Sequence, residues 1–241
     1  MNAATGARIF RRVVITSILQ TTPLRKHQLL QKQHVHSAAI VHSKTNIITS
    51  YWKNKLRKIA IGQTGLLLYE NLVDRLDYDY FFKEYSMEDT FFSWFLITEL
   101  HVYMLSLRLM QDDDIGLKLR NSVVEAMWRD TETRTKKLGS TNSSLIKSQL
   151  VLLSDQFKAA LIGYDEGIMS DDTYLANSLW QRFFKMENVD PRKIEKLVHY
   201  MRQQVDDLSR VRMSEIFCDE PNIDWIRVKD LQDELKYENK I

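Results

Sequence analysis

Residues that interrupt helices are scarce in this chain and lie far apart. Between residues 70 and 217 there is one proline, Pro191, and the glycines are Gly116, Gly139, Gly163 and Gly167. Proline and glycine are the strongest local interrupters of helix. Between them, apolar residues recur three and four positions apart and do not alternate, which is the helical period. The sequence therefore predicts an all-α protein with a single compact multi-helix domain.

The apolar period divides the chain into seven predicted helices. They cover about 46–61, 66–83, 90–111, 117–137, 144–162 and 171–185, and the last one follows Asp190-Pro191. An Asp before a Pro is a strong start signal, because the Asp side chain caps the helix and Pro suits its first turn. Asp89 or Ser86 is the expected cap of the helix at 90–111. In the helix at 144–162, the expected inward residues are Leu145, Leu150, Leu153, Phe157 and Leu161.

The predicted domain organisation follows from these helices and from the charge. Residues 1–45 form a targeting segment with an unstructured linker, residues 46–65 a basic amphipathic helix, residues 66–215 the all-helical domain, and residues 216–241 a charged tail.

The most apolar stretch, Phe91–Leu109, is 19 residues long and could cross a bilayer by length. Glu99 and His101 lie at its centre, and each would cost roughly 2 kcal/mol or more at mid-bilayer. Its apolar residues occur nearly all round, so we expect the central buried helix of the domain. Glu99 and His101 are two residues apart and face different directions, which argues against a shared acid–base pair.

Charge is distributed unevenly along the chain. The first 69 residues contain 11 Lys or Arg and no acid, and the remainder holds all 32 acids. Residues 7–20 place Arg8, Arg11 and Arg12 beside an apolar helical stripe, the pattern of a mitochondrial import segment. A basic tail that binds anionic surfaces is the alternative. The histidines of this arm lack carboxylate or cysteine partners and are not expected to bind metal.

The predicted helix at 46–61 has an apolar face with Ile48, Trp52, Leu56 and Ile59. Its opposite face carries four cations, which are Lys53, Lys55, Arg57 and Lys58. Such a face can touch RNA, a ribosome or anionic lipid, although a solvated face is the more common explanation. The acidic remainder argues against a nucleic-acid channel, since phosphate neutralisation needs a basic face. We therefore expect no DNA partner.

The stretch GYDEGIMSDD, residues 163–172, gathers four carboxylates and two glycines. It lacks the ligand spacing of a calcium-binding EF-hand. We interpret it as a joint between helices, in which Gly163 ends one helix, Gly167 allows a second turn, and Ser170 caps the next helix. Asp171 and Asp172 then complement the dipole of that helix. A partner-facing acidic loop is the alternative.

The sequence shows no pattern of catalytic chemistry. It has no Gly-rich phosphate loop and no nucleophile elbow, and its single cysteine, Cys218, allows neither an intramolecular disulfide nor a Cys-based zinc site. We therefore predict a non-enzymatic protein without catalytic residues, cofactor or metal.

Several long, aromatic-rich blocks occur together in a characteristic order. They are YENLVDRLDYDYFFKEY (69–85), DTFFSWFLITELHVYM (89–104), MWRDTETR (127–134), GYDEGIMSDD (163–172), LWQRFF (179–184) and DPRKIEKLVHYMRQQV (190–205). In this order the blocks resemble the ubiquinol–cytochrome c chaperone family over about residues 66–210.

The resemblance implies an all-helical assembly chaperone for respiratory complex III, with no established catalytic residues. Members of the family act on the matrix side of the mitochondrial inner membrane. They bind newly made cytochrome b, together with a small helical partner, near the mitochondrial ribosome. With this function in view, the expected partner-binding residues are Trp94, Glu99, His101, Asp165, Glu166, Asp171, Asp172 and Trp180. A groove lined by Trp94, Phe95, Trp128 and Trp180 is one way to receive apolar helices.

Two other functions stay open. A haem-binding matrix protein would use His101 or His199 as an axial ligand. A translational activator at the ribosome, on RNA or on a membrane surface would act through the basic helix at 46–61.

Overall fold

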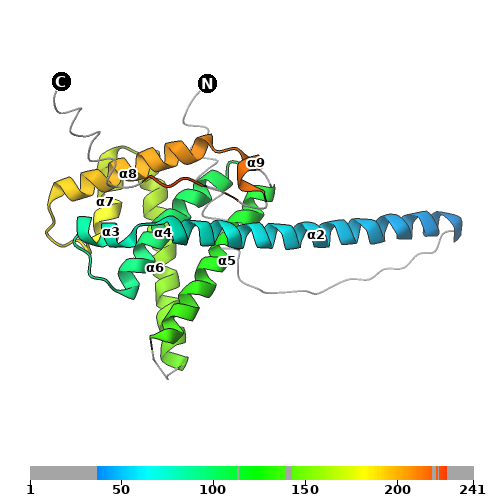
Figure 1. Ribbon diagram of the computed structural model, residues 1–241, viewed down its shortest axis with the longest axis horizontal. Coiled ribbons are helices and arrows are strands. Elements are labelled where there is room, and N and C mark those ends of the chain that lie inside the picture. The colour runs from blue at the N-terminus through cyan, green and yellow to red at the C-terminus, as the bar shows by residue number, and fades with distance from the viewer. Residues whose placement is uncertain (1–36, 113, 139–142, 219–220, 222, 227–241) are drawn as a thin grey trace.

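The computed structural model describes residues 37–112, 114–138, 143–218, 221 and 223–226, with side chains from Lys55 onward. In these residues the regular structure is entirely helical, which confirms the predicted all-α class (Figure 1). The helices are α2 (Ser37–Arg75), α3 (Tyr78–Glu84), α4 (Phe91–Leu109), α5 (Asp114–Lys137), α6 (Ser143–Met169), α7 (Asp172–Phe183), α8 (Pro191–Arg210) and α9 (Met213–Ile216).

Helix α4 is the centre of the domain, as predicted. From Ser93 to Leu109 every residue is buried, and α2, α3, α5 and α8 all pack against the helix. The helix begins after Thr90, whose hydroxyl accepts a hydrogen bond from the Ser93 amide at 3.2 Å. The expected cap at Asp89 or Ser86 is therefore wrong. No helix in the described part of the chain is long and apolar enough to cross a membrane.

Helix α2 runs without a break through the region where two separate helices were expected. Residues 37–45, expected to be unstructured, belong to it, and it ends at Arg75 instead of continuing to residue 83. Gly65 lies within this continuous helix, where its lack of a side chain allows α5 to pack closely. A Cβ at this position would lie 2.4 Å from the Ser122 side chain of α5. Figure 1 shows the N-terminal half of α2 projecting beyond the rest of the molecule.

Helices α5 and α6 are adjacent in the chain and in contact with each other, and they extend together from the body in Figure 1. Helix α6 is longer than expected, because it continues past residue 162 to Met169. Leu153, Phe157 and Leu161 are buried as predicted, but Leu145 is 48% exposed.

Helices α7 and α8 complete the body and pack on each other. Helix α8 begins as the sequence predicts. The Asp190 side chain accepts a hydrogen bond from the Arg192 amide at 3.0 Å, and Pro191 occupies the first turn.

The expected charged tail is in part a packed segment. Ile216 and Ile223 are buried, and both belong to the main apolar core. The backbone amide of Ile226 donates to Oε1 of Gln204 at 2.7 Å. Residues 223–226 therefore pack on the body instead of extending away from it as a charged tail. The import segment and residues 227–241 lie outside the described residues.

Candidate partner-binding site

Glu99 lies in the interior of the domain, where it forms an ion pair with Arg182 of α7. Arg182 donates from Nε to Oε1 at 2.8 Å and from Nη2 to Oε2 at 2.6 Å. The hydroxyl of Tyr164 in α6 donates to Oε1 at 3.2 Å. Burial raises the pKa of the Glu99 carboxyl, and the contacts with Arg182 and Tyr164 oppose this. Glu99 therefore joins three helices and is not exposed to a partner.

The ion pair with Glu99 also changes the pKa of Arg182. Burial alone would lower the pKa of its guanidinium, but the bonds to Glu99 keep that pKa above its ordinary value. A bidentate Arg–carboxylate pair is the strongest common ion-pair geometry. Its charge is thus held in place and neutralised, which suits a structural link between α4 and α7.

His101 is fully buried and faces Tyr200 of α8, whereas Glu99 faces Tyr164 and Arg182 of α6 and α7, so the expectation that the two point in different directions is confirmed. Its Nδ1 donates to the Ile97 carbonyl oxygen at 2.6 Å, and its Nε2 accepts from the Tyr200 hydroxyl at 2.7 Å. Burial lowers the pKa of His101 to about 4, so the ring is neutral at physiological pH. An axial haem ligand needs a free ring nitrogen and an open face. His101 has neither, so the haem-binding alternative through this residue does not fit.

The acidic stretch at 163–172 does join two helices, but in a different way from the prediction. Helix α6 continues through Gly163 and Gly167 to Met169. Gly167 allows a close contact with α7, since a Cβ there would lie 2.7 Å from Cα of Leu175. The cap of α7 is Asp171, not Ser170, and its side chain accepts from the amides of Thr173 and Tyr174.

Arg202 of α8 holds this joint together. Its guanidinium donates to the carbonyl oxygens of Gly167, Ile168 and Ser170 at 2.7–3.1 Å. Its Nε also pairs with Asp172 at 3.0 Å. The last carbonyls of a helix lack intrahelical partners, so one cation completes the end of α6 and the start of α7. Much of the acidic stretch thus has a structural role.

The remaining acids of the stretch divide between interior and surface. Asp165 is buried and accepts a hydrogen bond from the Tyr103 hydroxyl at 2.8 Å. Glu166, Asp171 and Asp172 are exposed. The surface part of the predicted acidic site is therefore these three residues.

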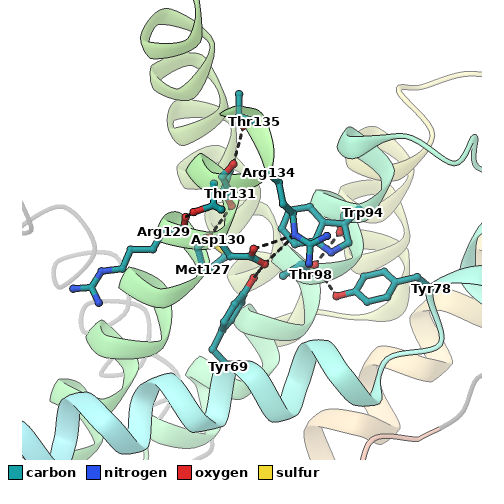
Figure 2. A network of polar contacts seen from close by, with 11 residues as sticks. Tyr69, Tyr78, Trp94, Thr98, Met127, Arg129, Asp130, Thr131, Arg134 and Thr135 are labelled. Atoms are coloured by element: carbon teal, nitrogen blue, oxygen red, sulfur yellow. Dashed lines mark hydrogen bonds and ion pairs between the residues drawn. The ribbon is translucent and has the colours of Figure 1, made fainter. Parts of the chain in front are cut away.

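Of the tryptophans expected to line a groove, Trp94 is buried in the core, and Trp128 and Trp180 are half-buried. Figure 2 shows Trp94 within a polar network, with the Arg134 guanidinium 4.2 Å from its ring centroid. Asp130 accepts from Arg134 at 3.0 Å and from the hydroxyl of Tyr69 in α2 at 2.8 Å. Trp128 packs on Phe95 and Phe157. Trp180 is half-buried, and its indole donates to the Glu187 carbonyl at 2.8 Å.

An apolar groove does exist, at a place that sequence reasoning missed. It has a volume of about 270 Å³ and lies where the start of α4, the end of α5 and α6 meet. Its lining is Phe91, Phe92, Thr135, Leu138, Gln149, Leu150, Leu152, Leu153 and Gln156, none of them charged. Leu138 and Leu152 are 67% and 59% exposed. The signal in the sequence was LVLL at 150–153, an apolar run too wide for one buried face.

The basic cluster of α2 is at the surface. Lys55, Arg57 and Lys58 are exposed, and the side chain of Lys53 lies outside the described residues. In the described part of the chain, no group of three or more His, Cys, Asp or Glu side chains is placed to hold a metal ion. The predicted residues therefore do not converge on one site. They divide among interior links, the surface of the α6–α7 joint and the basic face of α2.

Comparison with known proteins defines the class of protein. Residues 83–223 match the family described as ubiquinol-cytochrome C chaperone, which is more than half of the chain. The chain belongs to this family.

Its relatives include proteins of animals and yeast. Ubiquinol-cytochrome c reductase complex assembly factor 1 of Drosophila melanogaster is 46% identical over 175 residues, covering 71% of this chain and 67% of that protein. The Homo sapiens protein of the same name is 41% identical over 154 residues, covering 64% of this chain and 51% of that protein. Protein CBP3, mitochondrial, of Saccharomyces cerevisiae is 31% identical over 135 residues. The chain thus spans about half the length of its human relative.

A solved structure shows the same fold. The crystal structure of the Cbp3 homolog from Brucella abortus superposes with a TM-score of 0.62 at 17% identity, covering 76% of this chain and 98% of that one.

Proposed function

We propose that this protein is a non-enzymatic assembly chaperone for ubiquinol–cytochrome c reductase, complex III, in mitochondria. The observation that carries the proposal is membership of the ubiquinol-cytochrome C chaperone family over residues 83–223. The assembly-factor names of its relatives support it. The buried charged pair Glu99–Arg182 and the buried pair His101–Tyr200 are engaged with each other inside the domain, which supports a protein that acts through its surface.

The client in this proposal is newly made cytochrome b, which contacts the apolar groove at α4, α5 and α6. The groove lining has exposed leucines, while its polar members Thr135, Gln149 and Gln156 are uncharged. An uncharged apolar lining suits a membrane-type helix, whose own surface is apolar and which needs cover before insertion. A charged soluble helix would leave its polar groups without partners there.

The small helical partner in this proposal contacts the α6–α7 joint. Glu166, Asp171 and Asp172 give this surface negative charge, and Trp180 lies half-buried on the same helix as Asp172. Arg and Lys on the partner would complement the charge, mainly favouring association rate and specificity. Both contacts, with cytochrome b and with the small helical partner, are proposed to form near the mitochondrial ribosome at the matrix face of the inner membrane.

The test is cross-linking in intact mitochondria during translation, followed by identification of the attached proteins. We expect cytochrome b and a small helical protein to dominate. The groove variant Leu138→Asp/Leu152→Asp should lose the cytochrome b adduct and keep the small protein. The matched control is Tyr174→Asp/Met186→Asp, at positions 61% and 63% exposed outside the groove lining. Recovery of a metabolic enzyme in place of both adducts would contradict the proposal.

A further inference from the structure

A second hollow lies next to the apolar groove, and its walls are more polar. It has a volume of about 430 Å³ and is formed by the turn between α3 and α4, the start of α4, the end of α7 and the loop before α8. We call it the polar pocket. Phe92 lines both the groove and the polar pocket, so the two hollows meet at this side chain. The polar side chains of its lining include Ser86, Glu88, Thr90, Lys185, Glu187 and Asn188.

The two helices that end at the polar pocket, α3 and α7, are each followed by left-handed residues other than glycine. Ser86 has a φ of 53°, and Lys185 and Met186 have φ values of 51° and 63°. Glycine is the usual residue at such a helix end, because a side chain makes this conformation unfavourable. The side chains present there hold the cations of the pocket. The Ser86 hydroxyl accepts from Nζ of Lys193 at 2.6 Å, and Nζ of Lys185 lies 5.7 Å from the centroid of the Phe92 ring.

The acids of the polar pocket differ from its cations, because their carboxylates have no partner. Glu88 and Glu187 are exposed in the lining. Within the described residues, neither carboxylate forms a hydrogen bond or an ion pair. Asp89, next to Glu88 in the chain, adds a further exposed carboxylate. The groups available to a ligand from outside are therefore mainly negative.

The groove and the polar pocket together match an apolar helix that is flanked by basic residues. The groove lining carries no charge, whereas the polar pocket offers the carboxylates of Glu88 and Glu187. Membrane-spanning helices carry Lys and Arg in the loops on one side of the membrane. An acidic flank would be repelled by the two carboxylates. A flank without charge would cover them without pairing them, which is unfavourable.

We propose that the polar pocket binds the Lys or Arg residues that flank an apolar client helix held in the groove. The apolar stretch contacts the groove as far as Phe92, and the basic side chains pair with Glu88 and Glu187. An extended chain spans about 3.3 Å per residue, so the residues directly beside the helix reach the pocket. The inference rests on the groove as the client site of the proposed function, and it adds which part of the client is recognised by charge.

The test is binding of fluorescently labelled peptides to the purified full chain, measured by anisotropy. The two probes share one leucine–alanine helix sequence and differ only in the flank, which is Lys-Lys in one and Glu-Glu in the other. We expect the Lys-Lys peptide to bind about tenfold more tightly. This preference should weaken as salt is added, because charges at an exposed pocket are screened.

Three variants separate the pocket from the groove. Glu88→Lys/Glu187→Lys should abolish the preference for the Lys-Lys peptide or reverse it. The matched control, Glu70→Lys/Asp74→Lys, makes the same change in net charge at exposed positions of α2 and should keep the preference. Leu138→Asn/Leu152→Asn alters the groove without adding charge, and it should weaken the binding of both peptides by a similar factor. Circular dichroism should show the same helical signal for all three variants as for the unaltered chain.

Equal binding of the two peptides by the unaltered chain would overturn the proposal, and so would an unchanged preference in Glu88→Lys/Glu187→Lys. Tighter binding of the Glu-Glu peptide would also overturn it, because the pocket would then select anions through Lys185. Binding of neither peptide would remove it as well. The proposed assembly function is tested separately by the cytochrome b adduct in mitochondria. An adduct without any preference for the Lys-Lys peptide would contradict this inference alone.

Discussion

The surroundings of α4 and the outer face of α2, which is the exposed row Leu56, Ile59, Leu66 and Leu67, are opposite in character. Around α4, the charged groups Glu99 and Arg182 are buried, and each is paired with its neighbours. On α2, large aliphatic side chains such as Leu56 and Ile59 face solvent. A buried charged pair and a row of exposed large aliphatic side chains are both uncommon in a globular protein. The difference indicates that the interior polar residues hold the fold, whereas the exposed apolar residues are available for binding.

The largest expected effect comes from breaking the interior ion pair. Arg182→Leu leaves the Glu99 carboxylate buried without its cation, and we expect a loss of about 3–5 kcal/mol in the free energy of unfolding. Urea denaturation measures this. The double variant Glu99→Leu/Arg182→Leu removes both charges and should recover most of the loss. Equal destabilisation of single and double variants would show that the pair does not act as a unit.

The pH dependence of stability is the next largest effect. The pKa of His101 is about 4 in the folded protein against 6.5 ordinarily, so the unfolded state binds the proton first as pH falls. The free energy of unfolding should therefore drop between pH 6.5 and 4, by about 2 kcal/mol at pH 5. Tyr200 is the titratable side chain bonded to His101, and the Phe81 and Trp225 rings cover its other sides.

The control for this effect is His101→Gln, which cannot be protonated. Urea denaturation gives the free energy of unfolding at pH 7 and at pH 5. The difference between these two values should be smaller for His101→Gln than for the unaltered chain. An unchanged difference would assign the pH dependence to another group.

The packing of α6 on α7 gives a smaller effect. Gly167→Ala places a methyl group 2.7 Å from Cα of Leu175, which forces the helices apart at a net cost of about 1–2 kcal/mol. Gly62→Ala is the matched control, because no atom lies within 4 Å of its added Cβ. It should stabilise α2 by up to about 1 kcal/mol through helix propensity. Thermal unfolding compares the two, and a stabilised Gly167→Ala would contradict the close contact.

The smallest effect on stability is expected on the outer face of α2. Leu56→Asp and Ile59→Asp remove little buried surface, so each should change the free energy of unfolding by less than about 0.5 kcal/mol. Urea denaturation and circular dichroism test this. A large destabilisation would show that the outer face packs within the protein.

Sequence reasoning located the helices well because their apolar period is local information. The limits of α4, the start of α8 and the burial of Ser93–Leu109 follow from residues close in sequence. Gly167 was misinterpreted as the site of a second turn because its role depends on a distant neighbour. It meets Leu175 of α7, and this contact is not visible in the sequence.

The candidate site was harder to predict for a related reason. A carboxylate such as Glu99 or Asp165 is visible in the sequence, but its partner is not, and Arg182 lies 83 residues from Glu99. Interior links were therefore grouped with surface charges. The groove and the outer face of α2 were missed because apolar periodicity identifies which residues are apolar, not which faces a neighbour covers.

The central claim is that the interior charges of this chain are structural and that it acts through its surface. The direct measurement is the amount of assembled complex III in cells that lack the chain and express Glu99→Leu/Arg182→Leu, a variant whose folding is first confirmed in solution. The account predicts complex III at the level given by the unaltered chain. A folded double variant that supports no complex III would contradict it, because a reactive carboxylate would then be essential.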